Sequence, residues 1–244
     1  MPQRAVVAKK TDRSDELSAP AQGLLLVDKP AGMTSHDVVQ HVRRVYGERS
    51  IGHLGTLDPF ATGLLVLLLG RATRLATFIE AEPKVYEATI RFGEETDTDD
   101  ATGTVIRTAS APREADVRSA VKSLTGTISQ VPPAYSAKSV DGTRAYDAAR
   151  RGEPLELASV NVTVHGWELG KLTHDSLSAV ITCSGGTYIR ALARDLGRLT
   201  SSAAHLESLR RTRAGAFDVR DAATLESLTD NPARVRALRV VPDA

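Results

Sequence analysis

One carboxylate stands alone in a loop that is rich in turn residues. The stretch GHLGTLDPFATG, residues 52–63, holds three glycines, one proline, one histidine and a single acid, Asp58. Pro59 disfavours the helical conformation at Asp58, and the glycines let the backbone turn tightly or approach a ligand closely. Asp58 is therefore either a positioned acid that a ligand can reach or a turn-capping residue, which is common in Asp-Pro sequences.

Spacing excludes the other familiar sites. There is no phosphate-binding or dinucleotide-binding glycine motif and no G-x-S-x-G nucleophile elbow. In DTDDATG, Ala101 stands where a calcium loop needs an oxygen ligand, and His36 and His41 miss the i, i+4 spacing of a helical zinc pair. Cys183 is the only cysteine, which excludes an intrachain disulfide, and we interpret it as a buried hydrophobe. We expect no metal and no cofactor.

The elements that position Asp58 follow from hydrophobic patterning. An apolar run, 64–69, directly follows the loop and predicts a strand buried on both faces. Further strands are predicted at 24–32, ending in a Pro/Gly turn, at 85–92, 159–169 and 177–183, and in AGAFDV. Helices are predicted from Thr34 or Ser35 to Gly47, at 115–124, at 186–199 with Ile189, Leu192, Leu196 and Leu199 buried, and at 203–211. This order favours a mixed, mainly antiparallel sheet flanked by helices.

Composition fits a soluble globular protein of one large or two small domains. The 244 residues are 41% hydrophobic and 25% charged. No apolar run is long enough for a membrane span, and the N-terminus lacks the apolar region of a secretory signal. We predict a disordered lead-in over residues 1–22 and a cytoplasmic location.

Charge is clustered although the net charge is only +1. Residues 94–100 hold five acids, and residues 190–213 hold six arginines against two acids. Such clusters can form a basic face that the neutral total hides, or ordinary solvated helix faces. The stretch 130–154 is long, polar and without a core-facing stripe, so we expect a functional or mobile loop.

Several stretches, in this order, resemble the TruB family of bacterial tRNA pseudouridine synthases: LLLVDKPAGMTSHDVV, GHLGTLDPFATGLLVL, KVYEATIRFGEETDTDDATG, QVPPAYSAKSVDGTRAYDAARRGE, CSGGTYIRALARDLG and HLESLRRTRAG. The resemblance covers about residues 23–220, which we expect to form the catalytic domain. It implies the pseudouridine synthase fold and isomerisation of the uridine at position 55, in the TΨC loop of tRNA, after the base is flipped out.

The resemblance also implies residue roles. Asp58 matches the catalytic nucleophile, although attack on the sugar, attack on carbon 6 and a glycal route all stay open. Tyr86 matches the tyrosine that stacks on the target base, and Arg190 matches the arginine that pairs with the nucleophile. The other matched positions are the substrate-pocket residues Tyr188 and Leu209, a histidine that holds the RNA, His53, and Lys29, which is either structural or a phosphate contact.

Residues 130–154 match the thumb loop that relatives close over the tRNA hairpin. Its cations suit RNA phosphates: Lys138, Arg144, Arg150 and Arg151. The implied partner is the TΨC arm of tRNA, bound by a monomer that needs no guide RNA and no membrane.

The chain departs from the family pattern at three places. Leu54 stands where relatives often carry a small or hydroxyl residue, the N-terminal tail is extra, and residues 221–244 are too few for a complete PUA domain. The alternative functions are a non-enzymatic tRNA-folding chaperone and a synthase that acts on another RNA.

Overall fold

The computed structural model describes residues 21–140 and 142–230. The predicted disordered lead-in over residues 1–22 therefore falls almost wholly outside the described residues, as does the last part of the 221–244 segment. No helix within the described ranges is long and apolar enough to cross a membrane.

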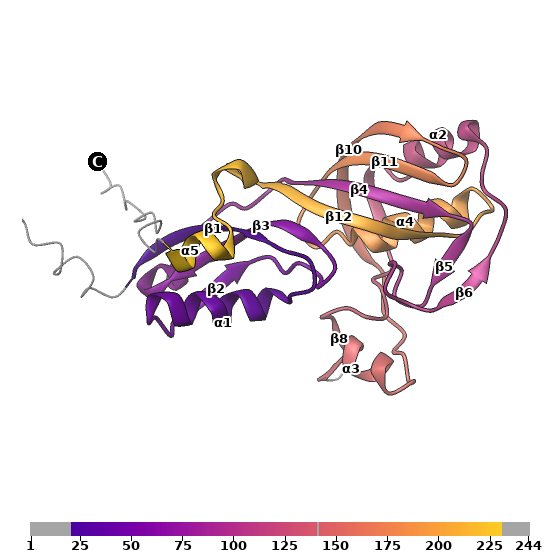
Figure 1. The fold of residues 1–244 in the computed structure, drawn as a ribbon. Coiled ribbons are helices and arrows are strands. Elements are labelled where there is room, and N and C mark those ends of the chain that lie inside the picture. The colour runs from indigo at the N-terminus through magenta and orange to yellow at the C-terminus, as the bar shows by residue number, and fades with distance from the viewer. Residues whose placement is uncertain (1–20, 141, 231–244) are drawn as a thin grey trace, which may run out of the picture.

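A nine-stranded sheet organises the molecule (Figure 1). Seven strands follow the order β1-β3-β12-β4-β11-β10-β7, while β2 pairs with β3 and β13 with β12. Every pairing is antiparallel except β3 with β12, so the mixed, mainly antiparallel sheet is confirmed. The strands are β1 (Gly23–Lys29), β2 (Ile51–Leu54), β3 (Thr62–Leu69), β4 (Lys84–Phe92), β7 (Gly126–Gln130), β10 (Val160–Leu172), β11 (Ser176–Cys183), β12 (Ala204–Ala214) and β13 (Phe217–Asp218).

The first part of the sheet, with β1 to β3, packs on helix α1 (Ser35–Tyr46) and on the short helix α5 (Leu225–Asp230). Thr34 and Asp37 form a reciprocal capping box at the start of α1, and Gly47 ends the helix in the left-handed conformation with φ 62°. Buried valines of α1 meet the alternate leucines of β3. Strand β3 is buried on both faces, because α1 covers one side and the 3-10 turn after β3 covers the other.

The second part, with β4 and β10 to β12, carries helices α2 (Glu114–Ser123) and α4 (Ile189–Leu199) on one face (Figure 1). Tyr86, Ala88, Ile90 and Phe92 alternate along β4 and are all buried on this face, as their period-2 pattern predicts. Cys183 is buried in the same core. The hairpin β5 (Glu94–Thr96) with β6 (Val105–Thr108) follows β4.

The predicted helix over 203–211 is wrong, because these residues form β12 in the middle of the sheet. A bulge lies between Leu206 and Ser208, so that Leu206 pairs with Ile90 and Leu209 with Ala88. The extra residue brings Leu206 and Leu209 to the same face although they are three apart. A bulged strand thus imitates the apolar spacing of a helix.

Helix α4 buries three of the four residues of the predicted stripe. Ile189, Leu192 and Leu196 are buried, but Leu199 at the last turn is 55% exposed. Arg190 and Arg194 are buried instead, because the start of α4 faces acidic residues and backbone carbonyls.

Residues 130–154, the projecting segment, extend away from the sheet (Figure 1). They hold the two-stranded hairpin β8 (Ser139–Val140) with β9 (Thr143–Arg144) and the short helix α3 (Ala145–Arg150). The expected lack of an apolar stripe is wrong, because Ala145, Ala148 and Ala149 are buried. Pro132 and Pro133, near the root of the segment, are buried as well.

Candidate active site

The Asp58 loop joins β2 to β3, and hydrogen bonds fix it from outside. The Ser35 hydroxyl, at the start of α1, accepts from the Leu57 N–H at 2.9 Å and donates to the Leu57 carbonyl at 3.1 Å. The Gly32 N–H donates to the Pro59 carbonyl at 2.8 Å. Asp58 is therefore held between two fixed neighbours, and the turn after it closes through the Ala61 N–H.

Arg190 binds Asp58 with a bidentate pair of hydrogen bonds. Its Nε donates to Asp58 Oδ2 at 2.9 Å, and its Nη2 donates to Asp58 Oδ1 at 3.0 Å. The Arg190 side chain is 5% exposed, whereas that of Asp58 is 34% exposed. A planar guanidinium fixes both the position and the plane of a carboxylate, so Asp58 is oriented on one edge and open on the other.

The same guanidinium reaches two more parts of the chain. Arg190 Nη1 donates to the Thr98 carbonyl at 2.8 Å, and Nη2 also donates to the Tyr135 carbonyl, in the projecting segment, at 2.9 Å. Asp100 Oδ2 lies 3.7 Å from Nε. Arg190 thus connects the Asp58 loop, the acidic stretch 94–100 and the root of the projecting segment.

The two charge clusters seen in the sequence face each other inside the protein. Arg194 Nη1 donates to Asp99 Oδ2 at 2.9 Å, and Glu95 is buried between Arg107 and Arg198. Burial raises the pKa of Asp99 to about 6, although Arg194 and Arg190 oppose the rise. Both interpretations of the clusters as surface features are wrong for the buried members, which are the acids Glu95, Asp99 and Asp100 and the arginines Arg190, Arg194 and Arg211.

Tyr86 lies under the loop and is 6% exposed. Burial raises the pKa of its hydroxyl, and the positive charge of Arg211 opposes the rise. Leu209, on the neighbouring strand, belongs to the same core and is 7% exposed. These two side chains and Leu57, which directly precedes Asp58, belong to the same hydrophobic core.

Tyr188 is the N-cap residue of α4 and precedes Arg190 by two positions. The buried side chain of Gln130 binds the Tyr188 backbone twice: its Nε2 donates to the carbonyl at 3.1 Å, and its Oε1 accepts from the N–H at 2.9 Å. Burial raises the pKa of the half-buried Tyr188 hydroxyl, and the nearby Ser136 side chain opposes the rise. The end of β7 is thereby locked to the start of α4.

Lys29 is wholly buried, and its ammonium donates to the carbonyls of Pro30, Met33 and Pro59 at 2.9, 2.7 and 3.3 Å. Burial lowers its pKa to about 8, while Asp58 acts in the opposite direction. Of the two roles left open, the structural one is supported by these contacts, because the ammonium faces carbonyls and not the surface.

His53, on β2, is half-buried, and burial together with the charge of Arg211 lowers its pKa. Its Nδ1 has no hydrogen-bond partner in the part of the chain that the structure describes. Leu54 follows it and packs against the core under β3. The lowered pKa favours the neutral imidazole, and its Nδ1 is both buried and without a partner among the described residues.

The four cations predicted to contact RNA all lie on the projecting segment and are exposed: Lys138, Arg144, Arg150 and Arg151. Arg150 also lies over the Tyr146 ring, 5.5 Å from its centroid. The structure brings none of the four into contact with Asp58, so any role they have is at the periphery of the site.

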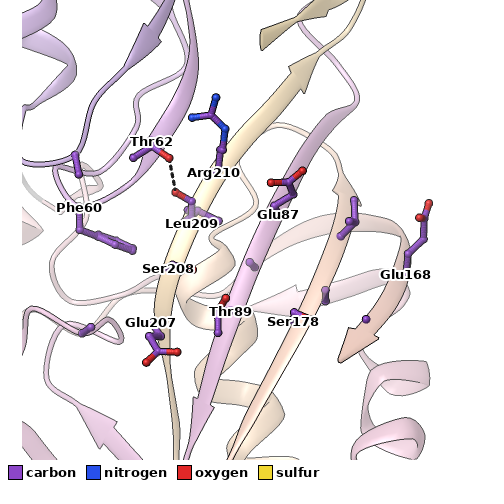
Figure 2. Close-up of a pocket in the computed structure, with 16 residues that line it drawn as sticks. Phe60, Thr62, Glu87, Thr89, Glu168, Ser178, Glu207, Ser208, Leu209 and Arg210 are labelled. Atoms are coloured by element: carbon purple, nitrogen blue, oxygen red, sulfur yellow. Dashed lines mark hydrogen bonds between the residues drawn. The ribbon is translucent and has the colours of Figure 1, made fainter. Parts of the chain in front are cut away.

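A cleft of about 750 Å³ lies on the open face of the sheet, opposite α4 (Figure 2). Figure 2 shows Phe60, two residues after Asp58, pointing toward Leu209 and Ser208 of β12. Its lining includes three acids, Glu87, Glu168 and Glu207, and one base, Arg210. Asp58, Tyr86 and Arg190 do not line it, and its acidic lining would repel RNA phosphates. We therefore place the candidate site at Asp58.

The arrangement can perform nucleophilic or acid–base chemistry with one carboxylate, because Asp58 is oriented and accessible. Within residues 21–140 and 142–230, no group of three or more His, Cys, Asp or Glu side chains is placed to hold a metal ion.

The sequence does not reveal several residues that build this site, namely Asp99, Asp100, Gln130, Arg194 and Arg211. Arg194 follows Arg190 by one helical turn, which signals a shared face. Arg211 carried no usable signal, since its strand was predicted as a helix. The acids follow a pattern that resembles a calcium loop, and their partners become visible only in the fold.

Comparison with known proteins identifies relatives along most of the chain. The model of the TruB family pseudouridylate synthase N-terminal domain matches residues 43–189, and that of the tRNA pseudouridylate synthase B C-terminal domain matches residues 190–239. The tRNA pseudouridine synthase B of Thermobifida fusca is 52% identical over 85% of this chain and 74% of its own length. That of Arthrobacter sp. is 50% identical over 85% and 71%.

Solved structures share the fold. A Cbf5-Nop10-Gar1 complex matches with a TM-score of 0.67 and 27% identity, over 86% of this chain and 54% of that chain. An H/ACA RNP bound to a substrate RNA containing 2′-deoxyuridine matches with a TM-score of 0.65 and 25% identity, over 90% and 55%. The chain thus spans about half the length of these two structures.

Proposed function

The chain belongs to the TruB family and is a tRNA pseudouridine synthase, and we propose that it isomerises the uridine at position 55, in the TΨC loop, with Asp58 as nucleophile. In this reaction the bond from N1 of uracil to C1′ of the ribose breaks and a bond from C5 to C1′ forms. C5 loses a proton and N1 gains one, so the step balances without an oxidant or a reductant.

The observation that carries the proposal is the asymmetric exposure of the Asp58–Arg190 pair. A carboxylate with its own buried guanidinium stays oriented, and its 34% exposed side chain leaves an edge for a nucleotide. A protein that only binds RNA gains nothing from such an acid, because RNA is itself a polyanion.

The neighbouring residues support base flipping. A uridine inside a folded loop must leave its stack, at a cost of a few kcal/mol, and it then needs apolar or aromatic walls. We propose that Tyr86 and Leu209, which belong to the same core as Leu57, supply such walls. We also propose that Tyr188, whose pKa responds to the charges of Arg190 and Asp58, contacts the nucleotide and that His53 contacts the rearranged RNA.

The test is to incubate the protein alone, without a guide RNA, with an unmodified tRNA transcript and to map pseudouridine chemically. We expect one modified position, 55. Release of the C5 proton, followed with tritium at C5, gives the rate. Pseudouridine at another position would contradict the substrate assignment, and tight binding with no isomerisation would support the chaperone alternative.

Asp58→Asn tests the nucleophile, because an amide keeps the shape of the side chain but does not attack. We expect isomerisation to be abolished. The affinity for tRNA should stay within about threefold of that of the wild-type protein. Asp175→Asn is the matched control, since Asp175 pairs with Arg91 at the surface far from the loop. Turnover by Asp58→Asn above background would refute the role of Asp58.

A further inference from the structure

Arg211 is an arginine at the centre of the sheet with no exposed surface. It lies on β12 between Gly63 of β3 and Tyr86 of β4. None of the ion pairs found among the described residues involves it. A buried charge is costly unless hydrogen bonds compensate for it, so its contacts indicate what it is retained for.

Arg211 hydrogen-bonds the chain on both sides of the Asp58 loop, at Gly55 where the loop begins and at Leu64 inside β3, while its Nη1 has no partner among the described residues. Arg211 Nε donates to the Leu64 carbonyl at 2.7 Å, and Nη2 donates to the Gly55 carbonyl at 3.1 Å. Gly55 precedes Asp58 by three residues, and Leu64 follows it by six. One planar guanidinium therefore fixes the separation of the two chain segments between which Asp58 is suspended.

Two of the loop glycines make room for this arrangement. A side chain at Gly63 would overlap the Arg211 backbone, and one at Gly55 would lie 3.4 Å from Arg211 Nη1 and 3.0 Å from Lys84 Nζ. Gly55 also has a φ of 84°, which favours glycine. Gly52 is different, because a Cβ there would meet nothing nearer than 4.0 Å.

We propose that Arg211 is a positioning residue of the reaction: it closes the Asp58 loop at both ends and so holds Asp58 in register with Arg190. It does not touch the reacting atoms. This inference rests on the proposed role of Asp58. Arg190 can bind both carboxylate oxygens of Asp58 because Arg211 holds the loop in the required position.

The test compares two adjacent arginines of the full-length protein. Arg211→Lys keeps the charge but loses the fork, and Arg211→Gln removes the buried charge and keeps at most one of the two hydrogen bonds. Arg210→Lys and Arg210→Gln are the matched controls, because Arg210 points to the other face, where it pairs with Asp28 and is 37% exposed.

We expect both Arg211 variants to lose at least tenfold in single-turnover rate, scored as pseudouridine at any position, with RNA affinity within threefold. The Arg210 variants should stay within threefold in both. Hydrogen exchange without RNA should speed up in residues 52–64 of the Arg211 variants and stay unchanged in β11. This measurement tests the loop even if the proposed substrate is wrong.

Three results would overturn the proposal. The first is a normal rate in Arg211→Lys. The second is a loss of RNA affinity equal to the loss of rate, which would make Arg211 an RNA-binding residue. The third is failure of both Arg211 variants to fold while the Arg210 variants fold, which would make Arg211 a residue of the core only.

Discussion

The Asp58 loop and the projecting segment look alike in sequence but are held in different ways. Both are polar stretches with glycine and proline. The backbone of the loop receives hydrogen bonds from Ser35, Lys29 and Arg211 on three other elements. Among the described residues, the backbone of the projecting segment receives side-chain hydrogen bonds from other elements near its root, where Arg194 donates to the Val131 carbonyl and Arg190 to the Tyr135 carbonyl.

Beyond the root, the projecting segment binds mainly itself. Its backbone bonds run from Ala145 N to Lys138 O and from Tyr146 N to Ser136 O, and the buried residues of α3 are alanines. The rigidity of each segment therefore depends on whether other elements hydrogen-bond its backbone, and not on its amino-acid composition. A fixed Asp58 next to a basic projecting segment that is weakly anchored suits an enzyme that must admit a folded RNA.

Arg190 binds both regions, so among the changes that compare them its substitution should have the largest effect, smaller only than that of Asp58→Asn. Arg190→Lys keeps a charge but cannot bind both oxygens of Asp58 together with the Tyr135 carbonyl. We expect the single-turnover rate to fall at least about tenfold, or roughly 1.4 kcal/mol, with little change in affinity. Arg198→Lys, on the same helix but paired with Glu95, is the control. Normal turnover with weak binding would make Arg190 a phosphate contact.

RNA should sharpen the contrast between the two regions. We expect a hairpin of the TΨC arm to slow amide hydrogen exchange in residues 137–151 by about tenfold, because the projecting segment becomes ordered on the RNA. Residues 52–64 should change less, since they are already fixed. Equal hydrogen exchange of the projecting segment with and without RNA would show that it is already rigid in the free protein. Anchoring of the segment by Pro132 and Pro133 would then explain its rigidity.

Removing the cations of the projecting segment should weaken RNA binding and leave the rate of isomerisation unchanged. For the combined change of Lys138, Arg144, Arg150 and Arg151 to Gln, we expect affinity to fall about fivefold near physiological salt and its salt dependence to become less steep. The rate at saturating RNA should stay within about threefold. Arg113→Gln with Arg118→Gln on α2 is the control pair. An unchanged salt dependence would place the RNA elsewhere.

The smallest expected effect is on the pH dependence of stability, through Asp99, which pairs with Arg194 at the root of the projecting segment. Because burial raises the pKa of Asp99 to about 6 from an ordinary 3.8, the folded state binds more protons than the unfolded state between these values. The contribution of Asp99 to stability therefore falls as pH rises from about 4 to 6, and it is constant above.

Asp99→Asn should remove this slope. Asn tolerates the left-handed backbone of this position, where φ is 61°. Thermal unfolding of both proteins at pH 4 to 7 measures the difference, and we expect the melting temperatures to differ by a few degrees in their pH response. Parallel curves would mean that the Asp99–Arg194 pair stays ionised throughout.

Local patterns determined much of the fold. The capping box and Gly47 set both ends of α1, alternation set β4, and a wholly apolar run set β3. Each of these signals acts within a few residues, so a sequence displays it directly. The Asp58 loop was also visible, because Gly and Pro report backbone conformation locally.

Tertiary structure decided the rest, since it depends on partners that lie far apart in the chain. The bulge in β12 gives a strand the spacing of a helix, and only its pairing with β4 reveals this. Asp58 and Arg190 are 132 positions apart, and Arg211 is 156 from Gly55. Whether an arginine is a surface charge or a buried clamp is set by the carbonyls and acids that the fold brings to it, because burial makes an unpaired charge costly and a paired one specific.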